Sequence, residues 1–394
     1  MSTEMRRRTF ILKGARAAAG CALVPLVTGL SGPYGATAST TGGESAAQIP
    51  ELERLIARLM KEALVPGVAI AVIRDAKLVW RQEFGVKDSA SGAPVDDRTV
   101  FEAASVSKTV FAYAAMKLCD KGVIGLDTPL ATYLPERFLA GDARLDRITA
   151  RHVLSHTSGF QNWRSGAQPL RIHFEPGERH LYSGEGYFYL QSVMTHLAGR
   201  RDSTVCARYE ADLEVCATDI ARYMTANVLT PFGMASSGYA SNDSLEGRSA
   251  RPHDVAGKPL AKGLPTATGA ARYAAAGGLH TTAADYARFL LEILDPRPSD
   301  AFRLTKGSLQ DMLRPQVKVD ASTSWALGWQ VRHTPQGDIV QHQGGQSGFQ
   351  AFTAASVARR SGFVMLTNGA NGSKVFYDET FSGAMDRFLF GIAA

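Results

Sequence analysis

The sequence predicts an α+β fold, sandwich-like in its layers, in which one antiparallel sheet is built from N- and C-terminal segments and flanked by helices. Three observations predict it: strand patterns near the N-terminus, helical patterns through the middle, and strand patterns again near the C-terminus. Strands from both ends can share a sheet only if the chain between them packs beside it. We therefore expect a mainly helical insert over roughly residues 105–290, with any active site in the cleft between insert and sheet.

The N-terminal part of the folded chain is expected to be a helix followed by a hairpin. Residues 39–50 are rich in Ser, Thr, Gly and Ala and predict a flexible linker, so folded protein is expected from Glu51. Apolar residues then recur at helical spacing, and two apolar runs flank a short polar turn. The expected elements are a helix over 51–64, a strand over 68–73, a turn over 74–77 and a strand over 78–85.

The remaining elements follow from the same two periodicities. Helical spacing of apolar residues recurs through the middle, at 107–121, 148–154, 187–197 and 282–294. Strand patterns return at 328–333, 339–341, 349–356 and 362–367, and a helical pattern over 377–392 closes the chain. Residues 51–394 are thus expected to form one domain.

Composition and charge are those of an ordinary globular protein. Of 394 residues, 45% are hydrophobic and 20% are charged, which suffices for a sizeable core. The net charge is +6, but residues 1–38 hold five basic side chains against Glu4, so this segment carries +4 and the remainder +2. A nearly balanced remainder gives no reason to expect nucleic acid or an anionic membrane as a partner.

Residues 1–38 look like a twin-arginine export signal. Arg7 and Arg8 precede a short apolar stretch over 17–30 and an Ala-Thr-Ala sequence at 36–38, the order of a signal peptide and its cleavage site. The apolar stretch is too short for a lasting membrane anchor. We expect a periplasmic or secreted protein; a basic arm without defined structure is the alternative.

Two cysteines leave the redox state open. Cys206 and Cys216 flank a short segment and could pair in an oxidising compartment, or could both remain buried free thiols. No Cys/His spacing resembles a zinc site, so no metal is expected.

The strongest chemical signal is a serine three positions before a lysine, Ser105 and Lys108, where a helix is expected to begin. This spacing places both side chains on one helix face. A serine hydroxyl needs a base within hydrogen-bond reach to act as a nucleophile, and a desolvated lysine can have its pKa lowered enough to serve. The helix N-terminus also favours developing negative charge.

Two later groups could complete such a site, because a serine and a lysine at this spacing are by themselves common. Tyr182, after a Pro-Gly turn, could relay a proton to a leaving group. His342 precedes Gly344 and Gly345 in a strand-like segment, whose edge could supply an oxyanion-hole N–H while the glycines let a substrate approach the backbone.

This set of residues resembles the three motifs of the serine β-lactamase and penicillin-binding superfamily, S-x-x-K, Y-x-N and K-T-G or H-x-G. It is most similar to the class C branch, which also includes D-alanyl peptidases and esterases. The similarity covers residues 51–394, with supporting stretches at 154–159, 182–187, 277–279 and 366–368.

The resemblance implies a role for each residue. Ser105 would be the acylated nucleophile and Lys108 its general base, while Tyr182 would share that base role and protonate the leaving group. His342 would stand where lysine is common, orienting the substrate and tuning Tyr182. The backbone N–H groups of Ser105 and Gly345 would form the oxyanion hole. No metal or organic cofactor is implied.

One position departs from the family pattern, since Gly184 stands where asparagine is usual. That asparagine ordinarily hydrogen-bonds an amide of the substrate, and leaving such a partner unpaired costs ~1 to 3 kcal/mol. Acyl transfer itself remains possible. The departure shifts weight toward an esterase or a peptidase of other specificity.

Five nearby residues have structural interpretations. His156 is expected to be a structural hydrogen-bonder, Ser107 to turn away from the lysine, Glu185 to brace the tyrosine loop, and Trp163 and Trp329 either to line the cleft or to pack in the core.

Three functions follow as alternatives. The first is a β-lactamase or D-amino-acid peptidase that opens an amide through acyl-Ser105; the second is a carboxylesterase on the same scaffold. A non-catalytic penicillin-binding module is third, because Ser105, Lys108 and Tyr182 are retained together. The α/β-hydrolase G-x-S-x-G motif is not found in its strand-turn-helix setting, and no spacing supports a triad through His156 or His342. The expected partner is a small-molecule amide or ester, and the oligomeric state stays open.

Overall fold

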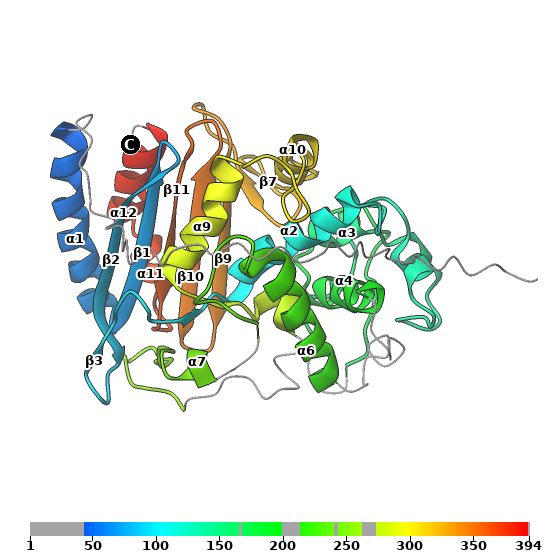
Figure 1. Cartoon of the computed structure of the whole chain (residues 1–394), viewed down its shortest axis with the longest axis horizontal. Helices are drawn as coiled ribbons and strands as arrows, with labels where there is room; N and C mark the ends of the chain where they lie inside the picture. The colour runs from blue at the N-terminus through cyan, green and yellow to red at the C-terminus, as the bar shows by residue number, and fades with distance from the viewer. Residues whose placement is uncertain (1–42, 165–167, 199–212, 240–242, 262–272, 393–394) are drawn as a thin grey trace, which may run out of the picture. The chain divides into compact units, whose positions relative to one another are not determined.

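The computed structural model describes residues 43–164, 168–198, 213–239, 243–261 and 273–392, and the account below concerns these residues. Among them, nine strands form one antiparallel sheet in the order β3-β2-β1-β11-β10-β9-β8-β7-β6, and β4 pairs with β5 in a second, small sheet (Figure 1). The strands are β1 Gly67–Arg74, β2 Lys77–Asp88, β3 Ala93–Pro94, β4 Phe101–Glu102, β5 His280–Thr281, β6 Val317–Lys318, β7 Thr323–Trp325, β8 Gln330–Arg332, β9 Ile339–Gln346, β10 Phe349–Ser356 and β11 Ser361–Thr367.

The described helices lie before the sheet strands, within the insert and at the end of the chain. They are α1 Gly43–Ala63, α2 Ser107–Asp120, α3 Ala150–Leu154, α4 Gly184–Leu197, α6 Leu213–Met224, α7 Asp243–Glu246, α9 Ala283–Leu294, α10 Lys306–Leu313, α11 Ser373–Phe376 and α12 Glu379–Met385. Short 3₁₀ turns are η1 Ala104–Val106, η2 Leu130–Tyr133 and η3 Ala143–Arg147, and π turns are η4 Thr225–Leu229 and η5 Asp386–Phe390.

Strand β1 joins the two ends of the chain, as the sequence predicts. It pairs with β2 on one side and with β11 on the other, where Val68 lies opposite Thr367. The β1–β2 turn places Asp75 and Ala76 at φ 51° and 57°, the left-handed pair that a tight hairpin turn requires. The expected hairpin and the expected single antiparallel sheet are therefore confirmed.

Helices cover both faces of this sheet. Val68, Ile70 and Val72 of β1 pack in one apolar cluster with residues of α1 and α12, and the alternate β1 residues join a second cluster with α2, α4 and α9. Successive strand side chains point to opposite faces, so a strand covered on both faces is apolar throughout. This explains why β1 has a continuous apolar run, and it gives the layers the sequence predicts.

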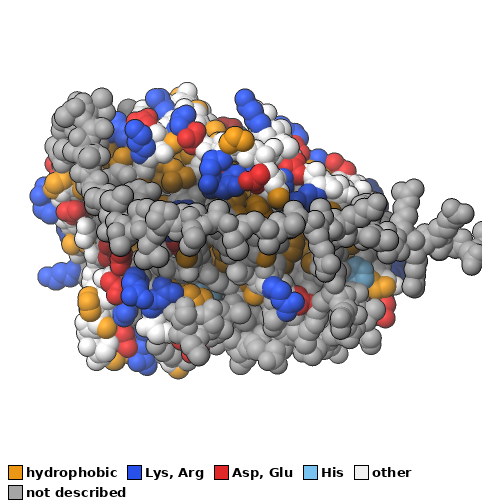
Figure 2. All heavy atoms as spheres, in the orientation of Figure 1, with side chains coloured by type: hydrophobic (Ala, Val, Ile, Leu, Met, Phe, Trp, Pro, Cys, Tyr) orange, Lys and Arg blue, Asp and Glu red, His pale blue; other side chains and the backbone are white. Residues whose placement is uncertain are grey.

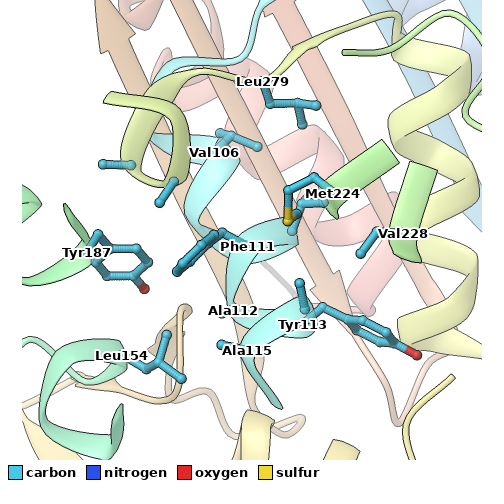
Figure 3. Packing of buried hydrophobic residues seen from close by; sticks show 14 of the residues in the cluster. Val106, Phe111, Ala112, Tyr113, Ala115, Leu154, Tyr187, Met224, Val228 and Leu279 are labelled. Atoms are coloured by element: carbon cyan, nitrogen blue, oxygen red, sulfur yellow. The ribbon is translucent and has the colours of Figure 1, made fainter. Parts of the chain in front are cut away.

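Helix α2 is the buried axis of the insert. All its residues from Ser107 to Leu118 are buried, which suits a helix with apolar contacts on every side. Figure 3 shows Phe111 directed toward Tyr187 of α4, whose ring centroid is 5.8 Å away, while Tyr113 lies on the opposite side of α2. This packing fixes the helix whose first turn follows Ser105.

The prediction of a linker over residues 39–50 is wrong for its second part, because α1 begins at Gly43 and continues through Pro50. Ile49 packs against the cluster formed with α12. Tertiary packing of an apolar face commonly outweighs local helix propensity, and this contact favours helix on the N-terminal side of the proline.

The surface mixes charges of both signs. Figure 2 shows Lys and Arg side chains interspersed with Asp and Glu on the face that it presents. Several charged side chains of the protein form ion pairs, such as Arg137 with Asp146 at 2.8 Å. This agrees with the near-balanced charge expected beyond residue 38. None of the described helices is both long and apolar enough to cross a bilayer.

Candidate active site

Ser105 lies in a strained turn between β4 and α2. Its neighbour Ala104 has φ 46°, a left-handed conformation that costs an alanine roughly 1–2 kcal/mol. Ala104 and Val106 are buried, whereas Ser105 is partly exposed. Ser107 holds the turn, because its hydroxyl donates to the Ala104 carbonyl at 2.6 Å and accepts from the Leu279 N–H at 3.0 Å. Ser107 therefore stabilises the turn, as expected, and Ser105 is the serine that is accessible to a substrate.

Lys108 is a base within hydrogen-bond distance of Ser105. Its Nζ lies 3.2 Å from the Ser105 Oγ and donates to the Ala276 carbonyl at 2.7 Å. Only 1% of the residue is exposed, and burial lowers its pKa from 10.5 to about 7. A large fraction of Lys108 is thus neutral near pH 7, and its free electron pair can accept the serine proton.

Tyr182 contacts the same serine. Its hydroxyl is hydrogen-bonded to the Ser105 side chain, and burial raises the pKa of the phenol above its ordinary range. The Lys108 Nζ lies 4.9 Å from the centre of the Tyr182 ring. Because the phenol stays protonated at neutral pH, Lys108 is the group prepared to accept a proton and Tyr182 the group prepared to give one.

His342 lies beside Tyr182 but carries no charge. Burial, reinforced by the positive charge of Lys108, lowers the pKa of His342 to about 3. Its Nδ1 is hydrogen-bonded to the Gln343 carbonyl at 2.7 Å, which makes Nδ1 the protonated nitrogen, and among the described residues Nε2 has no partner. A neutral imidazole can tune Tyr182, whose ring centroid is 6.2 Å away, but it cannot supply the cation that lysine would.

The second half of β9 presents a free backbone edge near Ser105. β8 pairs with β9 only from Ile339 to Gln341, so from His342 onward the described partner of β9 is β10 alone. A methyl group on Gly344 would lie 2.4 Å from the Ala103 carbonyl oxygen and 2.9 Å from the Ser105 nitrogen. Only glycine permits this approach, which brings the strand against the nucleophile's turn. The oxyanion role of the Gly345 N–H stays a prediction.

Three contacts of the site were not evident from the sequence. The Ala276 carbonyl accepts a hydrogen bond from Lys108, 168 residues away in sequence, and the centroid of the Tyr187 ring lies 5.4 Å from the Lys108 Nζ. The buried Glu102 carboxylate accepts from Gln346 Nε2 at 2.7 Å, tying β4 to the end of β9, and burial raises the pKa of Glu102 to about 7. None belongs to a spaced motif, so only the fold reveals them.

His156 and Trp329, for which the sequence suggested structural roles, both have such roles. His156 accepts from the Ser183 N–H at 3.0 Å and its ring lies 4.2 Å from that of Tyr182, so it positions the tyrosine. Trp329 is fully buried and stacks on Phe289. It packs in the core and does not line the site.

The structure does not decide whether Cys206 and Cys216 form a disulfide. Cys206 lies outside the described residues, as do residues 1–38 with the export signal. Cys119 is a partly buried free thiol. Within the described ranges, no group of three or more His, Cys, Asp or Glu side chains is placed to hold a metal ion.

The chain matches known proteins over most of its length. A family model described as Beta-lactamase matches residues 52–382. Penicillin-binding protein 4 of Amycolatopsis lactamdurans is 27% identical in an alignment 352 residues long that covers 81% of this chain and 85% of that protein. Esterase EstB of Burkholderia gladioli is 31% identical over 121 residues, 30% of this chain and 31% of the esterase. The match thus spans about a third of the esterase's length.

Solved structures share the fold. A class C β-lactamase superposes with a TM-score of 0.68 at 18% identity, over 86% of this chain and 96% of that one. The D-alanine carboxypeptidase AmpC of Burkholderia cenocepacia gives 0.66 at 22% identity, over 86% and 99%. At these identities the likeness concerns the fold alone.

Proposed function

The chain belongs to the Beta-lactamase family, whose fold is that of serine hydrolases, and from this premise we propose that it hydrolyses carboxylic esters through an acyl-enzyme on Ser105. The observation that carries the proposal is the 3.2 Å contact between the Ser105 Oγ and a Lys108 whose pKa is about 7. A neutral amine at that distance is the base that a serine nucleophile needs.

The contacts support a sequence of proton transfers. Neutral Lys108 takes the hydroxyl proton as the Ser105 Oγ bonds to the carbonyl carbon, and the resulting oxyanion is placed toward the N–H groups of Ser105 and Gly345. As the intermediate collapses, the leaving alcohol oxygen takes a proton from Tyr182, which the Lys108 ammonium then replaces. Water then attacks the acyl-serine and its proton passes to this pair of groups. As the bond between the acyl carbon and the Ser105 Oγ breaks, the pair returns that proton to the Oγ and the acid leaves.

Two features favour an ester over the β-lactam or D-amino-acid amide that the family resemblance puts first. Gly184 supplies no side-chain amide to pair with an amide of the substrate. His342 is neutral, so it offers no charge to the carboxylate that β-lactams and D-alanyl peptides carry. An ester without either group leaves no buried substrate group unpaired.

The test compares two substrates and two serines. Wild-type protein is expected to hydrolyse p-nitrophenyl butyrate with a higher kcat/KM than nitrocefin and to be labelled by a fluorophosphonate. Ser105→Ala is expected to lose hydrolysis and labelling, while Ser91→Ala, which alters an exposed serine, retains both. Labelling of Ser105→Ala at the wild-type rate would refute the assignment of Ser105 as the nucleophile. A higher kcat/KM for nitrocefin than for the ester would favour the β-lactam or D-amino-acid amide instead. Turnover of neither substrate by the wild type would favour the non-catalytic binding module.

We also propose that the protein works outside the cytoplasm, on the support of Arg7, Arg8 and the Ala-Thr-Ala sequence at 36–38. Replacing Arg7 and Arg8 by lysine should leave an uncleaved precursor inside the cell. Unchanged export of that variant, detected by fractionation, would contradict the proposal.

A further inference from the structure

Trp163 fills the space that a side chain at position 184 would need. A methyl group on Gly184 would lie 2.1, 2.3 and 2.5 Å from three carbons of the Trp163 indole. Gly184 does not have a left-handed φ, so its backbone alone would accept any residue. The glycine is required because the indole occupies the place beside it.

Two segments are joined so that the indole is held there. The N–H groups of Gly184 and Glu185 both donate to the Asn162 carbonyl, at 3.0 and 2.9 Å, and the Ser183 hydroxyl donates to the Gln161 carbonyl at 2.9 Å. The three residues at the start of α4 thus fix the chain immediately before Trp163.

The residue after Trp163 is fixed just as firmly. The Glu185 carboxylate is fully buried and accepts from the Arg164 backbone N–H at 2.9 Å and from its guanidinium at 2.9 and 3.1 Å. Glu185 therefore braces this neighbouring segment; its expected role in bracing the tyrosine loop stays a prediction. With both neighbours of Trp163 tied to α4, the indole has a set position.

A second aromatic side chain continues the surface toward Lys108. Tyr273 meets the Trp163 indole edge to face, with centroids 4.7 Å apart and planes at 80°. Residues 273–277 are helical, so Tyr273 is one turn from Ala276, whose carbonyl binds Lys108. Gly184 is two residues from Tyr182, which contacts Ser105. Each member of the aromatic pair is therefore close to a segment that holds a reactive group, and both residues are partly exposed.

We infer that Trp163 and Tyr273 form the acyl-binding subsite of the enzyme and that it takes acyl groups ending in an aromatic or similarly flat apolar group. An indole and a phenol ring offer apolar faces and edges to such a group. The Arg164 guanidinium is engaged with Glu185, which leaves the subsite without a charge from that neighbour. This inference rests on the proposed ester hydrolysis and specifies its substrate.

The test measures selectivity between p-nitrophenyl phenylacetate and p-nitrophenyl acetate. Trp163→Ala should lower kcat/KM for the phenylacetate ester at least about tenfold and change the acetate ester less than about threefold, since acetate is too small to reach the rings. Trp163→Phe should retain most of the preference, and Phe302→Ala, which removes an exposed ring elsewhere, should retain all of it. An equal loss on both esters, or no loss on either, would overturn the inference.

A binding measurement separates this inference from the proposed function. In the Ser105→Ala background no acylation is needed, and calorimetry with phenylacetate and acetate anions gives the affinities directly. Phenylacetate should bind more tightly than acetate, and Trp163→Ala should abolish the difference. If the wild type hydrolyses no ester, the proposed function is wrong, but the two affinities still show whether Trp163 and Tyr273 form an aromatic subsite. Equal binding of the two anions would refute the subsite even if the protein hydrolyses esters.

Discussion

Replacing Lys108 by methionine should stabilise the protein at low pH, and this gain should disappear at high pH. The native state lowers the pKa of Lys108 from 10.5 to about 7 by burial. Below pH 7 both the native and the unfolded states hold the proton, and the native state contains a buried charge. Each pKa unit corresponds to about 1.4 kcal/mol, so this burial costs on the order of 5 kcal/mol. Methionine has a similar volume and removes the charge.

The methionine also leaves a polar group without its partner. The Ala276 carbonyl now accepts from the Lys108 Nζ, and an unpaired buried carbonyl costs about 1–3 kcal/mol. At pH 6 the variant should therefore be the more stable by about 2–4 kcal/mol. Between pH 7 and 9.5 the native lysine loses its proton while the unfolded one keeps it, so wild-type stability rises relative to the variant by about 3 kcal/mol. At pH 9.5 the two proteins should therefore differ by no more than about 1 kcal/mol.

Urea unfolding at pH 6 and pH 9.5, followed by fluorescence, measures both differences. Titrations of the other groups cancel when wild type and variant are compared at one pH. Lys61→Met, which alters an exposed lysine of α1, is the matched control. A wild-type to Lys108→Met difference that does not change between the two pH values would refute the burial argument and, with it, the proposed state of the base.

Two further results are expected. If neutral Lys108 is the base, the logarithm of kcat/KM for an ester should rise with pH at a slope of one below pH 7 and level off above it, because the pKa of Lys108 is about 7. A plateau reached only near pH 10 would contradict this. Gly344→Ala should cost about 1–3 kcal/mol in urea unfolding and lower kcat/KM, because its methyl group would press on the Ala103 carbonyl and the Ser105 nitrogen; a variant with wild-type stability and activity would show that β9 does not contact this turn so closely.

Long, regular elements were predictable from the sequence. β1, β10 and β11 have apolar runs long enough to show strand character, and α2 and α9 show clear helical spacing. β3, β6 and β7 have two or three residues each, too few for any periodicity to appear. The start of α1 was missed because the contact that favours it, made by Ile49, is tertiary.

The candidate site divides in the same way. Ser105, Lys108 and Tyr182 lie in spaced motifs, and the structure brings them together. The neutral state of His342 comes from burial by distant elements, which spacing does not report. Gly184 was evident as a departure from the family pattern, but its cause was not, because Trp163 is distant in sequence and reaches it only through the fold.

The position of β1 has a consequence for synthesis on the ribosome. The backbone N–H of Asp75, in the turn after β1, donates to the side chain of Ser361, which is 286 residues later in the sequence. The edge of β1 that does not face β2 pairs with β11, so it stays unpaired until β11 has been synthesised. Until then this nearly all-apolar strand has unpaired backbone groups along one side, the kind of edge that recruits other chains. This edge of β1 therefore stays open to other chains until β11, the last strand of the sheet to be synthesised, has emerged.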